Sequence, residues 1–368
     1  MIKLAHFITK SEVGGAQTWV KDQITLFEND FEHFLVTNKP GWLTDNIKVS
    51  DTLFSHGIES KFSVTAFLSI LSFVKKNKVD IIVASSASAG IYARLVRIFH
   101  RCRVIYVSHG WSCIYNGGRF KKLFVVIERM LSHLSEQVLC VSEKDKNDAL
   151  GILRIHKRKL THIRNCVFPR YTESLERREG GFRILFLGRL AHPKRPDLLI
   201  ESIKHLPHVQ LDIVGDGPLK EKCEILENVN FIGAVASFDD FNDYDLFALI
   251  SDSEGMPMSA LEAASAGIPL LLSDVGGCSE LVMGNGILVD NDPEQIVRSI
   301  EHMQKTILRL KKKLCIVVLN MTSRTLILNI NYYIWGEKIF TLKNEIITSY
   351  ESRGNNEIFS YGSGRFYW

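Results

Sequence analysis

Short apolar runs alternate with helix-length amphipathic segments along most of the chain, and this alternation constrains the fold more than any other feature. In the first half, apolar runs at 4–8, 81–84 and 104–107 precede amphipathic segments at 17–27, 89–99 and 120–132, and another run lies at 138–141. The second half restarts the alternation with apolar runs at 184–187, 209–214, 229–232, 246–250 and 270–272. Such alternation is typical of βαβ units on a parallel sheet. The sequence therefore predicts an α/β protein.

The length of the chain favours two domains. Single domains usually comprise roughly 100–200 residues, and this chain has 368. The segment 170–181 is polar and lacks apolar periodicity, so we interpret it as a linker. We expect a first domain at 1–170, a second at 171–335, and a C-terminal helix or tail at 336–368 that returns to the first domain.

Composition narrows the classes of partner and the cellular compartment. The formal net charge of +4 is too small to indicate a nucleic-acid partner, and none is expected. The seven cysteines are scattered and form no CxxC pair, which argues against a disulfide framework or a zinc site and favours the reducing cytoplasm. The N-terminus lacks the pattern of a signal peptide, and no apolar run reaches the ~18 residues of a membrane span.

Clusters of lysine suggest contact with the inner face of a membrane. Lys75-Lys76, Lys121-Lys122 and the run at 311–313 would attract an anionic surface, although charge runs are more often solvated faces. We therefore expect a cytoplasmic protein with peripheral membrane contact.

The segment 253–269 is the strongest candidate for a functional element. Pro257 suits a first helical turn, and Gly267 with Pro269 would end the helix about three turns later. Glu254 then precedes the helix, and Glu262 lies inside it. The backbone N–H groups from Met256 onward would face a diphosphate, while the two carboxylates would accept hydrogen bonds from sugar hydroxyls. The alternative is a pair of solvated surface acids.

Two cations follow the first apolar run of the second half. Arg189 lies at the end of the run, and Lys194 lies just before a helix that opens at Pro196. Together they would neutralise a diphosphate as a sugar departs, although each taken singly is often a solvated side chain.

Several glycines and one histidine also follow apolar runs. Gly14 and Gly15 would bring backbone amides to a phosphate, and Gly215 would let the backbone approach a ligand closely. The imidazole of His109 could hydrogen-bond a sugar hydroxyl, although a lone histidine there is more often a turn residue. The histidines form no HExxH pattern, so no metal site is expected.

These residues resemble, in order and spacing, the family-4 retaining glycosyltransferases of the GT-B fold over about 280 residues. The matching segments are Gly14-Gly15-Ala16-Gln17, His109, Val141-Ser142-Glu143, Asn165, Gly188-Arg189 with Lys194, Val214-Gly215-Asp216-Gly217-Pro218, Phe231-Ile232-Gly233, the E-x7-E element of Glu254 and Glu262, Gly276-Gly277 and Glu280. The segment 314–335 departs from the usual ending of the family.

The resemblance implies two Rossmann-like, doubly wound domains that face each other across a cleft, with the acceptor on the first and a nucleotide-sugar donor on the second. It implies a metal-independent reaction with no cofactor beyond the donor itself, and retention without a protein nucleophile. The catalytic residues it implies are His109, Glu254, Arg189 and Lys194. The donor-binding residues it implies are Gly14, Gly15, Arg189, Lys194, Gly215, Gly255, Met256, Pro257, Met258 and Glu262.

The expected function is transfer of a hexose or N-acetylhexosamine from a UDP- or GDP-sugar to a lipid-linked saccharide or polysaccharide acceptor in surface-glycan biosynthesis. Two alternatives remain. A nucleotide-sugar epimerase shares the GT-B architecture, but the E-x7-E element with Arg189 and Lys194 is the transferase pattern. A non-catalytic sugar-nucleotide-binding partner subunit is disfavoured because the candidate catalytic residues are all present.

Overall fold

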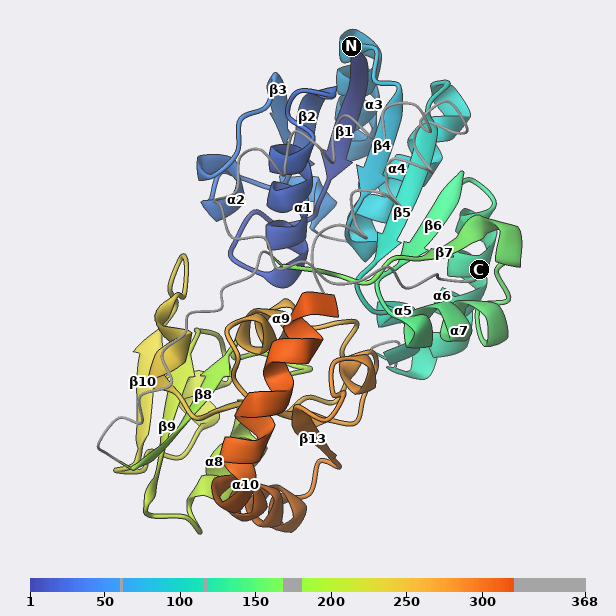
Figure 1. Cartoon of the computed structure of the whole chain (residues 1–368). Helices are drawn as coiled ribbons and strands as arrows, with labels where there is room; N and C mark the ends of the chain where they lie inside the picture. The colour runs from blue at the N-terminus through green and yellow to red at the C-terminus, as the bar shows by residue number, and fades with distance from the viewer. Residues whose placement is uncertain (60–61, 116–117, 168–180, 321–368) are drawn as a thin grey trace, which may run out of the picture. The chain divides into compact units, whose positions relative to one another are not determined.

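The structure is a computed structural model that describes residues 1–59, 62–115, 118–167 and 181–320 (Figure 1). It contains two parallel sheets with helices on their faces. Both sheets fall within one compact unit, Met1–Ser323. No helix among the described residues is long and apolar enough to cross a membrane. The expected boundaries 1–170, 171–335 and 336–368 stay predictions, and 168–180 and 321–368 lie outside the described residues.

The first sheet has the strand order β3-β2-β1-β4-β5-β6-β7. Its strands are β1 (Ile2–Phe7), β2 (Phe31–Thr37), β3 (Asp51–Phe54), β4 (Ile81–Ala84), β5 (Arg103–Ser108), β6 (Gln137–Cys140) and β7 (Leu160–His162). Its helices are α1 (Gly15–Leu26), α2 (Trp42–Asp45), α3 (Val64–Asn77), α4 (Ala87–Phe99), α5 (Ser112–Tyr115), α6 (Lys121–Ser132) and α7 (Glu143–Gly151). Every residue of β4 is buried, as expected for a strand covered on both faces.

The second sheet has the order β10-β9-β8-β11-β12-β13. Its strands are β8 (Phe182–Leu187), β9 (Val209–Val214), β10 (Val229–Gly233), β11 (Leu246–Leu249), β12 (Leu270–Ser273) and β13 (Gly286–Val289). Its helices are α8 (Pro196–Ile203), α9 (Met258–Ser265) and α10 (Pro293–Asn320). In both sheets the order reverses once, between β1 and β4 and between β8 and β11, which is the doubly wound arrangement.

The apolar runs found in the sequence all became strands, but four further strands were not anticipated. These are β2, β3, β7 and β13. β3 and β7 lie at the edges of the first sheet, where strands are short, and both carry polar residues. β13, at an edge of the second sheet, is the apolar segment Gly-Ile-Leu-Val and was overlooked. β2 carries Glu32 and His33 inside an apolar run, which obscured it.

One helical prediction also needs correction. α9 has eight residues, which is about two turns rather than three, because the chain already leaves the helix at Ala266. α10 continues to Asn320 and includes the backbone of the lysine run at 311–313.

Candidate active site

The loops that carry the candidate cations and the first candidate acid meet at the point where the second sheet reverses its strand order. β8 and β11 are neighbours in that sheet, and in open parallel sheets ligands bind outside the carboxyl ends at such a point. The loop after β8 holds Arg189 and Lys194, and the loop after β11 holds Glu254. The topology therefore brings together residues about 60 positions apart.

Backbone hydrogen bonds join these two loops into one unit. Lys194 and Ser251 form an antiparallel bridge. The amide of Arg195 donates to the carbonyl of Ile250 at 2.8 Å, and the amide of Asp252 donates to the carbonyl of Pro193 at 2.8 Å. Since both loops are held by main-chain bonds, the side chains they carry keep a fixed relation to each other.

Lys194 and Glu254 form a direct ion pair at this junction. The Lys194 Nζ donates to Glu254 Oε1, and the Ser251 hydroxyl donates to the same oxygen at 2.6 Å. The two side chains are only 17% and 11% exposed, so the pair is largely shielded from water. Glu254 Oε2 makes no hydrogen bond with any residue that the structure describes, which leaves one carboxylate oxygen available to a ligand.

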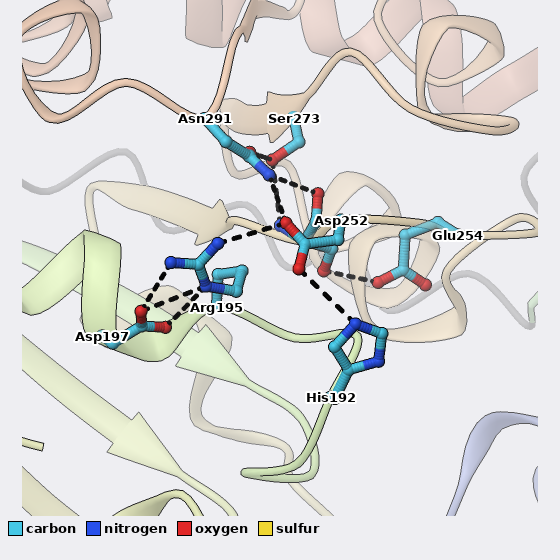
Figure 2. A network of polar contacts seen from close by, with 8 residues as sticks. His192, Arg195, Asp197, Asp252, Glu254, Ser273 and Asn291 are labelled. Carbon is cyan, nitrogen blue, oxygen red and sulfur yellow. Dashed lines mark hydrogen bonds and ion pairs between the residues drawn. The ribbon is translucent and has the colours of Figure 1, made fainter. Parts of the chain in front are cut away.

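A polar network fixes the loop of Glu254 from the other side (Figure 2). The Arg195 guanidinium donates to both carboxylate oxygens of Asp197 at 2.7–3.1 Å and to Asp252 at 3.3 Å. The Asn291 amide donates to the carbonyl of Ser251 and to Asp252, each at 3.0 Å. Sequence reasoning missed Arg195, Asp252 and Asn291, because nothing in their local spacing indicates that they support the same turn.

The Gly276-Gly277 turn after β12 supports the backbone of Glu254 directly. Gly276 has φ +54, and a Cβ there would lie 1.7 Å from the carbonyl oxygen of Glu254. The amide of Gly277 donates to the carbonyl of Gly255 at 2.6 Å. Only glycine fits this combination of left-handed backbone and close contact. The turn thus positions Glu254.

Gly215 makes its close approach to the protein itself. Its φ is +146, and a Cβ there would lie 2.0 Å from the carbonyl oxygen of Gly188, next to Arg189. The glycine therefore lets the turn after β9 pack on the loop that carries Arg189. A contact between Gly215 and a ligand stays a prediction. Arg189 is exposed. Its carbonyl accepts from the amide of Ala191 at 2.9 Å, while its guanidinium has no hydrogen bond or ion pair with the residues that the structure describes.

His109 and Gly15, two candidates from the first half of the chain, lie against residues of the second half. A Cβ on Gly255 would lie 2.5 Å from the carbonyl oxygen of His109, and a Cβ on Gly15 would lie 3.2 Å from Met258 Cγ. The His109 ring lies edge-on to Trp19, with 5.5 Å between centroids. Its Nε2 is buried and has no hydrogen-bond partner. Burial lowers the pKa of His109 to about 4, so the imidazole is neutral near pH 7.

The remaining candidates lie on or before α9 and α1. Met256, Pro257 and Met258 are buried at the start of α9, and the Met256 carbonyl accepts a hydrogen bond from the Asn165 amide at 3.2 Å. Glu262 lies half-buried in the second turn of α9. Gly14 precedes α1 in extended backbone, and a Cβ there would lie 2.6 Å from Oε1 of Gln17. Their contacts with a donor stay predictions.

Comparison with known proteins identifies the class. The model for Glycosyltransferase Family 4 matches residues 13–170, and the model for Glycosyl transferases group 1 matches residues 181–306. The O-antigen biosynthesis glycosyltransferase WbnH of Escherichia coli is 44% identical over 302 residues, covering 80% of this chain and 88% of WbnH. The protein is therefore a glycosyltransferase of the GT-B fold. It belongs to the family 4 glycosyltransferases.

Solved structures agree on the fold. Anabaena HepE in complex with UDP and glucose superposes with a TM-score of 0.75 at 17% identity, over 96% of this chain and 100% of HepE. The lipopolysaccharide outer core galactosyltransferase WaaB gives a TM-score of 0.64 at 21% identity, over 92% and 100%. A more distant relative, an Escherichia coli UDP-Gal:alpha-D-GlcNAc-diphosphoundecaprenol alpha-1,3-galactosyltransferase, is 25% identical over 81% of this chain and 87% of its own length.

Proposed function

We propose that the protein transfers a hexose or N-acetylhexosamine, with retention of configuration, from a UDP- or GDP-sugar to a lipid-linked saccharide or polysaccharide in surface-glycan biosynthesis. Two relatives support a role in surface-glycan biosynthesis. One is an O-antigen biosynthesis glycosyltransferase, and the other is a galactosyltransferase that acts on a diphosphoundecaprenol-linked sugar. The reaction would take place in the cytoplasm, at the inner face of the membrane.

The ion pair of Lys194 and Glu254 is the observation that carries this proposal. Without a ligand each charge compensates the other. A nucleotide-sugar offers a better partner to both, since its diphosphate is an anion for Lys194 and its sugar hydroxyls are donors for Glu254. Arg189, exposed on the same loop, would add a second cation to the diphosphate. Donor binding would then exchange one internal ion pair for several contacts with the donor.

The proposed reaction uses the donor phosphate as the base. The acceptor hydroxyl oxygen forms a bond to the anomeric carbon, the bond from that carbon to the phosphate oxygen breaks, and the phosphate oxygen takes the acceptor proton. Lys194 and Arg189 would stabilise the charge that develops on the leaving diphosphate, which is why no metal is invoked. The neutral His109 would hydrogen-bond the transferred sugar through Nε2.

Nucleotide release tests the proposal. The purified protein is incubated with UDP- and GDP-sugars and a lipid-linked acceptor, with and without EDTA, and the anomeric configuration of the product is determined by NMR. We expect acceptor-dependent release that survives EDTA, and a product that keeps the donor configuration. Glu254→Gln and Lys194→Ala should each reduce kcat/KM about a hundredfold or more.

Glu301→Ala, an exposed acid on α10, is the matched control and should leave release unchanged. An inverted product would contradict retention, and loss of release in EDTA would contradict metal independence. Epimerisation of the donor without acceptor would replace the proposal with the epimerase alternative.

A further inference from the structure

Helix α6 carries an apolar stripe that faces solvent. Large apolar side chains recur at the spacing of one helical face and are exposed, from 37% for Ile127 to 67% for Met130. The members of this α6 stripe are Phe120, Leu123, Phe124, Ile127 and Met130. Val126 beside it is 47% exposed. An ordinary surface helix hides such a face, so the exposure requires an explanation.

The opposite face of α6 is already fixed to the protein. Glu128 is buried and accepts from both terminal nitrogens of Arg94 on α4, at 2.5 and 3.3 Å. Arg94 itself is fully buried, with its guanidinium 4.2 Å from the centre of the Tyr106 ring. Arg129 donates to the carbonyl of Leu153 at 2.7 Å. Since these bonds hold the inner face, the helix cannot simply roll over to bury the stripe.

The exposed charges on α6 itself are all positive. Arg119, Lys121 and Lys122 are exposed at the start of α6, and its one acid, Glu128, is buried in the ion pair with Arg94. The adjoining turn after α7 repeats this chemistry, with exposed Ile152. The exposed cations of that turn are Arg154, Lys157 and Arg158. The sequence has no acid between Asp148 and Glu173.

Hydrogen bonds show that this turn adjoins α6. Lys159 Nζ donates to the carbonyls of Ser132, His133 and Ser135 at the end of α6, at 2.8–3.1 Å. Figure 1 likewise shows α6 and α7 together beside β7. The stripe and the basic turn therefore form one surface, apolar at its centre and cationic at its rim, which we call the α6 surface.

We propose that the α6 surface docks the enzyme on an anionic lipid bilayer. An amphipathic helix of this kind lies in the plane of the interface, with its apolar face at the boundary of headgroups and acyl chains and its cations among lipid phosphates. A protein partner would be expected to meet mixed charges, whereas here every exposed charge on α6 has the same sign.

The other candidate, the apolar side chains of α3, fits a membrane less well. Phe62, which lies just before α3, stacks on Tyr92 and packs against Phe67 within the protein. Lys76, at the far end of α3, is paired with Asp51 at 3.7 Å. The lysine pair at 75–76 is thus partly compensated, while Lys121 and Lys122 have no ion-pair partner among the described residues.

Vesicle flotation tests the proposal with the full chain and without donor or acceptor, so its failure would leave the proposed transferase function standing. We expect binding to phosphatidylcholine vesicles that contain phosphatidylglycerol, weak binding to pure phosphatidylcholine, and release at high salt. Leu123→Gln with Ile127→Gln, and separately Lys121→Ser with Lys122→Ser, should each weaken partitioning on the order of tenfold.

Matched controls come from the segment between β9 and β10 of the second sheet. Ile225 is 89% exposed, and Lys220 and Lys222 are exposed lysines beside it. Ile225→Gln and the double change Lys220→Ser with Lys222→Ser should leave partitioning unchanged. Turnover of a water-soluble acceptor should be unchanged in all four variants.

Equal partitioning of the α6 variants and the controls would overturn the proposal, as would equal binding to neutral and anionic vesicles. A dimer in size-exclusion chromatography that Leu123→Gln with Ile127→Gln dissociates, in a protein that ignores vesicles, would instead identify the α6 surface as a subunit interface.

Discussion

At the scale of single residues, the site is an ion pair whose partners were expected to act separately. Lys194 was predicted to bind a diphosphate and Glu254 a sugar, and in the structure they bind each other. Because both side chains are mostly shielded from water, loss of one partner leaves the other charge uncompensated. Single substitutions at these positions should therefore be checked for folding before activity is compared, and Glu254→Gln is preferable to alanine because it keeps the shape.

Asp145 supplies a prediction for stability against pH. It lies in the first turn of α7 with no exposed surface, and burial, with smaller effects of nearby Asp148 and Glu280, raises its pKa to about 7. The raised pKa means that the folded state binds the proton more tightly than the unfolded state. The contribution of Asp145 to the free energy of unfolding is therefore most favourable below its unfolded-state pKa near 3.9, and it is lost as the pH rises toward about 7.

Asp145→Asn removes this titration. The gain in unfolding free energy of the variant over the parent should grow by about 2–3 kcal/mol between pH 5 and pH 8. Urea unfolding at the two pH values measures it. A difference that stays constant with pH would show that Asp145 does not titrate in this range.

At the scale of elements, three turns meet around Glu254, and glycine permits each approach. Gly255 meets the carbonyl of His109, Gly277 the carbonyl of Gly255, and Gly276 the carbonyl of Glu254. These turns follow β5, β11 and β12, so strands from both sheets contribute to one cluster of backbone contacts.

Gly276→Ala should displace Glu254. An alanine with φ near +54 costs about 1–2 kcal/mol, and its Cβ would also overlap the Glu254 carbonyl, so the loop must move. We expect kcat/KM for nucleotide release to fall at least tenfold, with only a modest decrease in Tm. Gly118→Ala is the control, because its φ is +49 and no atom lies within 4 Å of the new Cβ. Equal activity in the two variants would contradict a positioning role for the Gly276 turn.

At the scale of the whole molecule, Glu280 connects the second sheet to the first. It follows β12, and its Oε1 accepts from the amides of Glu143 at 2.7 Å and Lys144 at 3.3 Å, at the N-terminus of α7. Its Oε2 accepts from Arg164 Nε at 3.3 Å. A carboxylate at the positive end of a helix is favourable, and this one is 13% exposed and therefore weakly screened.

Glu280→Ala should weaken the coupling between the two sheets. We expect calorimetry to show a lower Tm and a broadened or divided transition. Loss of the charged hydrogen bonds should lower the free energy of unfolding by a value on the order of 2 kcal/mol. Glu294→Ala is the control, since it removes an ion pair with Arg298 that is about 77% exposed and should change little. A single transition with an unchanged Tm would show that Glu280 does not couple the sheets.

Much of the architecture could be predicted because central strands of a parallel sheet are locally encoded. The runs at 81–84 and 209–214 match β4 and β9 residue for residue, and β4 is continuously apolar because it is buried on both faces. The edge strands β3 and β7 are short and carry polar residues, so their sequences do not stand out. The helix within the E-x7-E element was also predicted, because Pro257 and Gly267 mark the ends of α9 locally.

What the sequence could not decide is which of these side chains touch. The bond of Lys194 to Glu254 spans 60 positions and that of Glu280 to Glu143 spans 137, and no local periodicity encodes either. The same holds for the stripe on α6, whose spacing predicts an amphipathic helix but not which face is buried. Helices and central strands follow from short-range preferences, whereas these contacts depend on the reversal of strand order in each sheet, which only the packing of the whole chain determines.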